Sequence, residues 1–573
     1  MPYYVMHKIL AGLLSHHQLF DDARALRVAV RLAEHLLWRV ERLLRRGEAY
    51  WDGFRNLEVG GMSEALTDLA LATNDSSWLA LAARFERPCF IAPLALDYYR
   101  RLGTRAGSVE PSSRAVGGTE ARGGPSPAAR AVERMHGNTH LPQLLGAMAR
   151  YEATGLTALR GAARAFWEEL SARHQYVTGG STVSETWRGG LTLGDAVSQH
   201  GRSSFGAHDV HETCVSHNSM RVSRRLLMWG GDGDDDGTSH VLSHASYYER
   251  AMLNAVLGTQ RGTLPGSMLY MYPMGGGVSK ASYTSGSELH HWGDGSTHWC
   301  CQGSGIEAFA RLADSVFWAT NPSFRARRNS VNSVNSVNHP PVHPAARAAA
   351  KPSDGPPSSL AHLFLLQFIS CRLEWHAQRV AVELYAEEAG SRPASEPLQA
   401  EVRVLPLPRA TGADGERGGE GERGGRHSSG QADKWVLWVR IPEWAHGATI
   451  MARGRLRLAA AADGASASTP RSVDPGSLVP VWFVREGGAP PSSRAGRSAS
   501  QPPGATGALK LRWSAAVRWE RVADGRERFH RLQAPLWGPL VLAGYTYGER
   551  ALDTSVRMRP VPASAAGRLL VPN

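Results

Sequence analysis

Apolar positions in the first half of the chain follow the period of a helix. They recur every three or four residues in paired segments, as in amphipathic helices that pack in hairpins. Asp, Asn or Gly separates the members of a pair at 21–22, 74–75 and 154–155, where such residues cap helix ends. A fourth pair is expected at about 216–228 and 241–257. Helical hairpins with long loops predict an α/α toroid in which the loops gather at one open end.

The second half changes to short runs typical of β-strands. These runs are rich in β-branched and aromatic residues, and several alternate between apolar and polar positions. They read LFLLQFIS, RVAVELYAE, AEVRVLPL, KWVLWVRIP and LVPVWFV. Short strands separated by Gly- and Pro-rich turns predict a β-sandwich that follows the helical domain.

Low-complexity segments divide the chain further. A short repeat and many Pro and Ser residues fill 323–359, and such a composition does not build a packed core. Segments of similar low-complexity composition predict inserts at about 104–132, 408–432 and 487–507. The expected domains are an α/α catalytic domain at 1–322, a linker at 323–359, a β-sandwich at 360–548 and a C-terminal tail at 549–573.

Composition limits the classes of partner. The 573 residues are 42% hydrophobic, and the net charge of +12 comes mostly from arginine. Many arginines lie in Gly-rich segments such as 417–426. This distribution indicates solvated inserts rather than a nucleic-acid-binding surface, which needs basic residues clustered on one face. No window approaches the roughly 18 apolar residues of a membrane span, and the N-terminus lacks the features of a signal peptide. The sequence predicts neither a nucleic-acid nor a membrane partner and leaves the compartment open.

Two cysteine-containing segments carry the candidate chemistry. Five cysteines are too few for a disulfide scaffold, but HETC ends at Cys214 and WCC contains the adjacent Cys300 and Cys301. Neighbouring thiolates suit one soft cation. With Glu212 they would supply the four ligands that zinc prefers. The spacing differs from a zinc ribbon, so buried inert cysteines remain the alternative.

The helical pairs, the two cysteine segments and their order resemble glycoside hydrolase family 127, the β-L-arabinofuranosidases. The resemblance covers most of the chain. In the helical half it is carried by PYYVMHKILAGL, GGMSEALTDLALATND, HGNTHLPQLLGAMARYEATG, YVTGGSTVSETW, ETCVSHNSMRVSRRLL, YYERAMLNAVLGTQ and WCCQGSGIEAFARLADSVFW. RIPEWAHGATI and APLWGPLVLAG carry it in the β half. It implies an (α/α)₆ barrel followed by β-sandwich domains, with an arabinofuranoside as carbohydrate substrate.

The resemblance also implies a mechanism and its residues. Cys300 would attack the anomeric carbon and form a thioglycosyl intermediate, and Glu185 would donate a proton and later activate water. Zn²⁺ would be held by Glu212, Cys214, Cys300 and Cys301. Chemically, a free thiol with a pKa of about 8.5 is mostly protonated at neutral pH, and zinc would keep it as thiolate. A carboxylic acid with a raised pKa protonates a leaving oxygen.

Three histidines lie in blocks that resemble the family's sugar-binding segments. They are His7, His136 and His140, and a structural role is the alternative for each. For Glu185 the alternative is an ordinary solvated glutamate, although the glycines of its loop allow the backbone to approach a ligand closely.

Other aromatic and cysteine residues are less specific. Trp187, Trp292 and Trp299 either stack on a sugar ring or pack in the core. Cys89 and Cys371 lie in apolar contexts and are predicted to be buried and inert.

The chain departs from the family at both ends. The family's catalytic domain begins before a block like PYYVMHK, and family members continue past GPLVLAG into further β structure. We therefore expect a truncated chain and a toroid without its opening helices. Two functions stay open. One is a retaining glycosidase that removes non-reducing-end β-L-arabinofuranosyl or related pentosyl residues. The other is a catalytically inactive, zinc-stabilised carbohydrate-binding or remnant protein. The oligomeric state is left open.

Overall fold

The computed structural model describes most of the helical half and the strands of the β half. The described residues are 2–106, 125–198, 202–203, 206–207, 209–230, 237–261, 267–275, 292–293, 298–319, 361–387, 396–407, 434–458, 469–484 and 505–543. The predicted linker 323–359, the insert 408–432 and the tail 549–573 lie outside these ranges.

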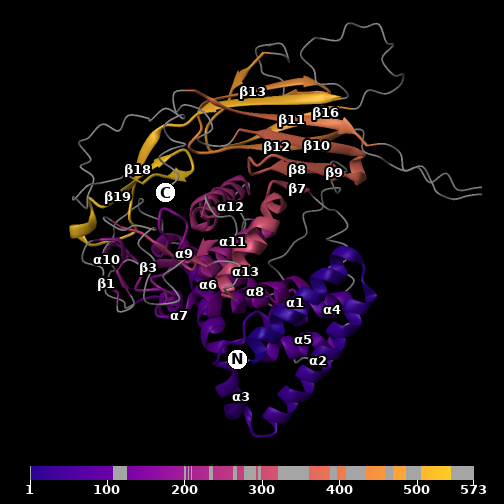
Figure 1. Cartoon of the computed structure of the whole chain (residues 1–573), viewed down its shortest axis with the longest axis vertical. Helices are drawn as coiled ribbons and strands as arrows, with labels where there is room; N and C mark the ends of the chain where they lie inside the picture. Colours follow the sequence, from indigo (N-terminus) through magenta and orange to yellow (C-terminus); the bar gives the residue numbers. More distant parts are fainter. Residues whose placement is uncertain are drawn as a thin grey trace, which may run out of the picture.

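Helices fill the first part of the chain (Figure 1). They are α1 (Pro2–Phe20), α2 (Ala23–Leu44), α3 (Glu48–Arg55), α4 (Met62–Thr73), α5 (Ser77–Arg84), α6 (Pro88–Ala106), α7 (Pro127–Val132), α8 (Gly137–Thr154), α9 (Thr157–Arg173), α10 (Gly194–Val197), α11 (Thr213–Trp229), α12 (Thr238–Ala251) and α13 (Cys300–Ala310). A π-helical turn, Met252–Val256, extends α12. The short strands between them are β1 (Arg202–Ser203), β2 (Gly206–Ala207), β3 (Asp209–Glu212), β4 (Met268–Leu269), β5 (Met271–Pro273) and β6 (Trp292–Gly293).

The predicted turns have the expected capping chemistry. The Asp22 carboxylate accepts hydrogen bonds from the backbone of Arg24 and Ala25 at 2.7 and 3.3 Å and so caps α2. Asn74 and Gly155 end α4 and α8 in the left-handed conformation, with φ of 54° and 75°. These three helical hairpins confirm the prediction from periodicity.

One predicted boundary was wrong. The segment 104–132 reads as a low-complexity insert, yet α7 lies within it at Pro127–Val132. Its Ala128, Ala131 and Val132 are buried against the core of α6, α8 and α9. The alanines give this segment its low-complexity composition. Their small side chains also let the short helix pack closely.

The helices pack around two apolar clusters. One cluster joins α1 to α5 around Leu10, Leu36, Trp51 and Leu66. The other joins α6 to α9 and α11. The predicted order, a helical region followed by a multi-sheet β region, is confirmed, while closure of the helices into a toroid stays a prediction.

The described residues of the β half form three sheets. Its strands are β7 (Phe317–Ala319), β8 (Ala361–Leu365), β9 (Cys371–Trp375), β10 (Val380–Ala386), β11 (Leu398–Pro406), β12 (Lys434–Ile441), β13 (His446–Gly454), β14 (Leu456–Leu458), β15 (Arg471–Ser472), β16 (Ser477–Val484), β17 (Gly507–Ser514), β18 (Val517–Arg521), β19 (Gln533–Trp537) and β20 (Leu540–Val541). The sheet orders are β15-β13-β17-β11-β10-β9, β14-β16-β12-β8-β7 and β18-β19-β20. Inward residues of the two larger sheets, such as Leu437 and Val402, share one apolar core.

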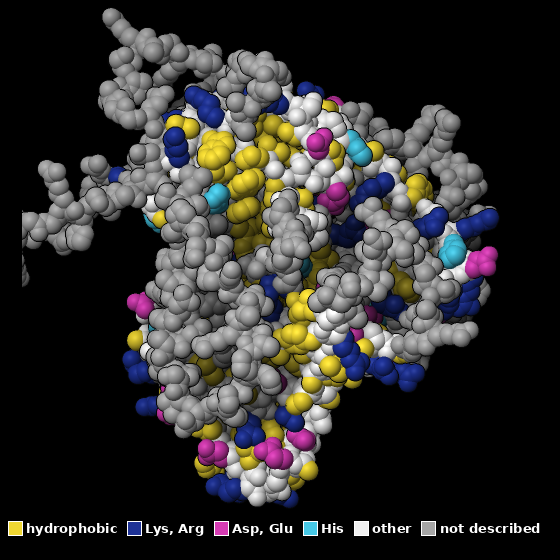
Figure 2. Space-filling view, turned by 180° about the vertical axis from the view of Figure 1, so that it is seen from behind, with side chains coloured by type: hydrophobic (Ala, Val, Ile, Leu, Met, Phe, Trp, Pro, Cys, Tyr) yellow, Lys and Arg dark blue, Asp and Glu magenta, His cyan; other side chains and the backbone are white. Residues whose placement is uncertain are grey.

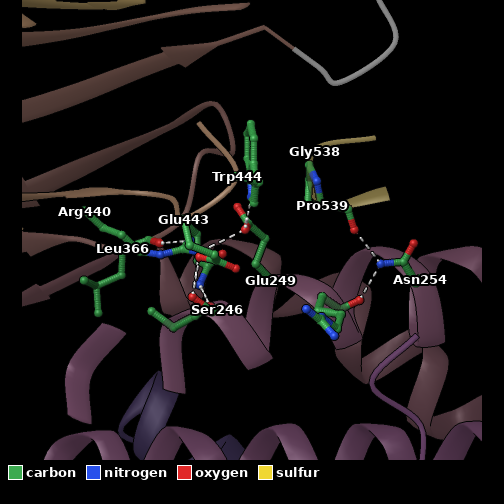
Figure 3. Close-up of polar contacts among 12 residues, drawn as sticks. Ser246, Glu249, Asn254, Leu366, Arg440, Glu443, Trp444, Gly538 and Pro539 are labelled. Carbon is green, nitrogen blue, oxygen red and sulfur yellow. Dashed lines mark hydrogen bonds and ion pairs between the residues drawn. The ribbon is translucent and has the colours of Figure 1, made fainter. Parts of the chain in front are cut away.

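A buried charged cluster fixes the larger sheets to α12. Arg440 of β12 is fully buried and donates to the Glu249 carboxylate at 3.0 Å and to the Leu366 carbonyl at 3.2 Å (Figure 3). Glu249 also accepts from the Trp444 indole at 2.9 Å. The side chain of Asn254 binds the edge of the smallest sheet, at the carbonyl of Pro539. The β half is therefore anchored on the helices that lead to the candidate site.

The surface shows no single basic stripe on the face in Figure 2, where Lys and Arg side chains are scattered among acidic ones. Among the described helices, none is long and apolar enough to cross a bilayer.

Candidate active site

The four predicted metal ligands come together from two helix starts. Glu212 ends β3 and precedes α11, whose first turn contains Cys214. Cys300 and Cys301 are the first two residues of α13. The candidate ligand atoms of these four residues all lie within 4.8 Å of one another. Segments almost ninety residues apart in the sequence thus converge on one point.

The donor set fits a soft divalent cation. The Glu212 carboxylate is fully buried, and its Oε2 has no hydrogen-bond partner among the described residues. Burial raises the pKa of Glu212, Cys214 and Cys301, because their charged forms lack solvent. A bound cation would remove this penalty. Three thiols and one carboxylate are ligands that tetrahedral zinc accepts.

Cys300 differs from the other two cysteines of the cluster. Hydrogen bonds from the Cys214 and Cys301 thiols lower the pKa of its own thiol. Its side chain is only partly buried, whereas Cys214 and Cys301 are buried. Cys300 is therefore the thiol of the cluster best suited to react.

Glu185 lies at the tip of a tight hairpin. Val183 and Thr186 exchange backbone hydrogen bonds of 2.9 and 3.2 Å, which leaves Ser184 and Glu185 as the two tip residues. Ser184 has a φ of 53°, a conformation that costs a non-glycine residue about 1–3 kcal/mol. The Gly137 amide donates to the Glu185 carbonyl at 2.7 Å. The strained tip presents the carboxylate at a fixed place.

Two side chains hold that carboxylate. The Tyr270 hydroxyl donates to one oxygen at 2.7 Å, and His136 Nε2 lies 3.2 Å from the other. The hydrogen bond from His136 is the main reason that the pKa of Glu185 is lowered. Burial alone would lower the pKa of His136, but the bond to Glu185 and its charge raise it. The contact with His136 therefore favours the charged form of Glu185.

Tyr270 also connects the carboxylate to the thiol. Cys300 Sγ lies 3.8 Å from the Tyr270 hydroxyl oxygen, and Trp299 packs edge-on against the Tyr270 ring at 5.8 Å. Sequence reasoning missed Tyr270, since it stands between two short strands and no local pattern marks it. Tyr4 was also missed. Burial and the charge of Cys300 raise the pKa of its phenol, and Lys8 donates to its hydroxyl at 2.7 Å.

The three predicted sugar-binding histidines occupy different environments. His136 accepts from the Thr139 amide through Nδ1, so its Nε2 carries the hydrogen that faces Glu185. His140 is buried, with Nδ1 on the His136 carbonyl at 2.9 Å and Nε2 on Arg87 at 3.3 Å. Neither ring nitrogen of His140 is open to a sugar hydroxyl in this arrangement.

His7 is half-buried behind a glycine pair. A Cβ at Gly60 would lie 2.3 Å from the His7 ring, so only glycine permits this approach. Burial lowers the pKa of His7 to about 4, and its Nδ1 has no hydrogen-bond partner among the described residues. The ring is therefore neutral, and its Nδ1 lies buried against Gly60.

The remaining candidates separate into core and surface. Trp187 is fully buried and donates to the Ser181 hydroxyl at 3.0 Å, which assigns it to the core. The Trp292 side chain lies outside the described residues. The prediction that Cys89 is buried was wrong, because it is exposed at the start of α6, whereas Cys371 is half-buried on β9. On α6 the next residue, Phe90, turns inward instead.

A helical region followed by packed β-sheets, together with the family match of its helical region, assigns the chain to the glycoside hydrolases. Residues 1–314 match the family model of the β-L-arabinofuranosidase GH127 catalytic domain. The chain belongs to this family.

Several solved structures are similar to this chain at low sequence identity. A GH127 β-L-arabinofuranosidase from Geobacillus stearothermophilus T6 is 15% identical, with a TM-score of 0.49 over 94% of this chain and 66% of that chain. A protein described as a glycoside hydrolase is 13% identical, with a TM-score of 0.51 over 94% and 68%. A GH127 β-arabinofuranosidase is 14% identical, with a TM-score of 0.48 over 94% and 63%. The chain spans about two thirds of the length of these structures. Comparison with curated proteins gives no match.

Proposed function

We propose that the chain removes non-reducing-end β-L-arabinofuranosyl, or related pentosyl, residues with retention of configuration. Cys300 is the nucleophile and Glu185 the acid and base. The observation that carries this proposal is the Tyr270 hydroxyl, 2.7 Å from Glu185 and 3.8 Å from Cys300. Because Glu185 and Cys300 contact the same oxygen atom, they lie close to each other. Their separation is comparable to the roughly 5–5.5 Å between the two carboxyl groups of retaining glycosidases.

In the first step the Cys300 sulfur attacks the anomeric carbon. A carbon–sulfur bond forms as the glycosidic carbon–oxygen bond breaks, and the leaving oxygen takes a proton from Glu185. The alternative, expulsion of an unprotonated alkoxide, is much slower, since a positioned acid typically contributes about 10²–10⁴-fold.

In the second step Glu185 accepts a proton from water. The water oxygen attacks the anomeric carbon, the carbon–sulfur bond breaks, and Cys300 leaves as a thiolate. Two inversions restore the original configuration at the anomeric carbon.

Glu185 must take up a proton before it can act as the acid. In the resting site the hydrogen bonds from His136 Nε2 and from the Tyr270 hydroxyl favour the charged carboxylate and lower the pKa of Glu185. A sugar bound beside Glu185 would exclude water, and such burial favours the neutral carboxyl group. Glu185 then carries the proton that the leaving oxygen receives.

Glu212, Cys214, Cys300 and Cys301 are the residues that would hold zinc. When bound, the ion would supply the positive charge that keeps the cysteines as thiolates at neutral pH. The chain's own contribution is to orient Cys300, through the start of α13 and its contact with Tyr270.

Incubation with an aryl β-L-arabinofuranoside tests the proposal. The wild-type chain is expected to release the aryl alcohol and to give an initial sugar product of retained configuration, seen by NMR. The Cys300→Ala variant should lose this turnover, while Cys89→Ala, far along the chain and exposed, should keep it. Turnover that survives Cys300→Ala would overturn the proposal.

A further inference from the structure

The segment that follows Glu185 leaves the helical region and meets the C-terminal sheet. In Figure 1 the hairpin of β18 and β19 reaches down to α10 and β3. The turn between those strands pairs with residues 191–194. The Gly525 amide donates to the Leu191 carbonyl at 3.1 Å, and Thr192 and Asp524 form an antiparallel β-bridge. The β half thus contacts the chain only a few residues beyond the acid hairpin.

A buried carboxylate makes this contact specific. The Asp524 side chain is fully buried and accepts from the Gly194 amide at 2.8 Å. It also accepts from the Arg526 guanidinium at 2.6 Å. Arg526 in turn donates to the Thr192 carbonyl at 3.1 Å and pairs with Asp195. Removal of Asp524 leaves the Gly194 amide without its acceptor, and removal of the Arg526 side chain leaves a buried carboxylate with backbone donors alone.

Shape reinforces the contact. A Cβ at Gly194 would lie 2.4 Å from the Phe529 ring, and the Arg526 guanidinium lies 4.6 Å from the centre of that ring. Phe529 is itself buried. The turn between β18 and β19 therefore packs directly against the backbone of α10, and a side chain at position 194 would have no room.

An apolar cluster links this contact to the acid hairpin. Tyr176, Val183, Leu193 and Val210 form a small buried core, and Val522 and Ala523 of the β half pack against it. Val183 is the residue whose backbone pairs with Thr186 to close the hairpin of Glu185. Displacement of the β18–β19 turn would loosen the same cluster that supports the stem of this hairpin.

We propose that Asp524 and Arg526, on the β half of the chain, are positioning residues for the acid Glu185. This inference rests on the proposed function for the role of Glu185. The acid hairpin is held by His136 and Tyr270 on one side and, through Val183 and Leu193, by the Asp524 contact on the other. A misplacement of about 1 Å at a reacting group can cost about 10²-fold in rate.

The leaving group of the substrate provides the test. A dinitrophenyl leaving group needs little acid assistance, whereas a methyl glycoside depends on it. In Asp524→Ala, kcat/KM for a methyl β-L-arabinofuranoside should fall at least about tenfold more than kcat/KM for the dinitrophenyl analogue. Arg528→Ala is the matched control, because Arg528 also pairs with Asp195 but is largely exposed, and it should leave both values unchanged. Equal losses on both substrates would overturn the positioning role.

Hydrogen exchange gives a second readout that needs no activity. In Asp524→Asn, a milder change that keeps the side-chain shape, the amides of Val183 and Thr186 should exchange faster than in the wild type. Faster exchange confined to 191–195 would overturn the proposal. If the wild type hydrolyses neither substrate, the proposed function fails, and the exchange of the Val183 and Thr186 amides still decides whether the β half holds the hairpin.

Discussion

His136 Nε2 faces one carboxylate oxygen of Glu185 at 3.2 Å, and the two side chains shift each other's proton affinity in opposite directions. The backbone fixes this relationship, since His136 caps α8 through its Nδ1 and the Gly137 amide binds the Glu185 carbonyl. His136 therefore holds the Glu185 carboxylate from the first turn of one helix.

The hydrogen bond between His136 and Glu185 predicts the basic limb of the pH profile. Glu185 must be protonated to act as the acid, and the bond from His136 lowers its pKa. In His136→Ala this bond is lost, so the pKa of Glu185 should rise and the basic limb of kcat/KM should move to higher pH. The measurement is a pH profile with a methyl glycoside. A basic limb that stays in place or moves to lower pH would show that His136 does not set the proton affinity of the acid.

Metal content tests the cluster of Glu212 and the three cysteines. We expect about one zinc per chain in the wild type and less than about half an equivalent in Cys214→Ser, since a four-ligand site that loses a thiolate loses much of its affinity. Elemental analysis of protein purified without chelators provides the measurement. Cys371→Ser, on β9 of the β half, serves as the control and should keep its zinc. Equal zinc in Cys214→Ser and wild type would refute this ligand set.

The Arg440 cluster predicts a large stability effect between the two halves of the chain. Arg440→Met leaves the Glu249 carboxylate buried without its guanidinium partner (Figure 3), and such a change costs about 3–5 kcal/mol. Arg372→Met removes only exposed pairs with Glu374 and Glu383, which are worth about 0–1 kcal/mol. Urea unfolding compares the two. A similar small loss in both variants would mean that Arg440 does not anchor the β half.

Part of the site could be predicted from the sequence because its residues stand in distinctive blocks. Cys300 and Cys301 are adjacent, and HETC supplies Glu212 and Cys214. Their convergence depends on β3 and the start of α13 meeting, and the family resemblance supplied that long-range information. Tyr270 has no such signal. Its role arises only because Thr213 binds the Tyr270 carbonyl and so brings that segment to the site.

The fold shows the same division between local and long-range information. Helices such as α2 are predicted by their apolar period and by a cap such as Asp22. The contact of Asp524 with Gly194 joins residues more than three hundred positions apart, and no local pattern encodes it. Trp187 shows a further limit, because its sequence context suits either a sugar platform or the core, and only its full burial decides between them.

The covalent role of Cys300 is tested most directly by trapping the glycosyl-enzyme. In Glu185→Ala, a dinitrophenyl β-L-arabinofuranoside should still glycosylate the chain, because its leaving group needs little acid, while the second step lacks its base. Mass spectrometry of the intact chain should then show the addition of one pentosyl group, and peptide mapping should place it on Cys300. A pentosyl group on another residue, or no adduct while Glu185→Ala continues to release the dinitrophenol, would contradict the role of Cys300 as nucleophile.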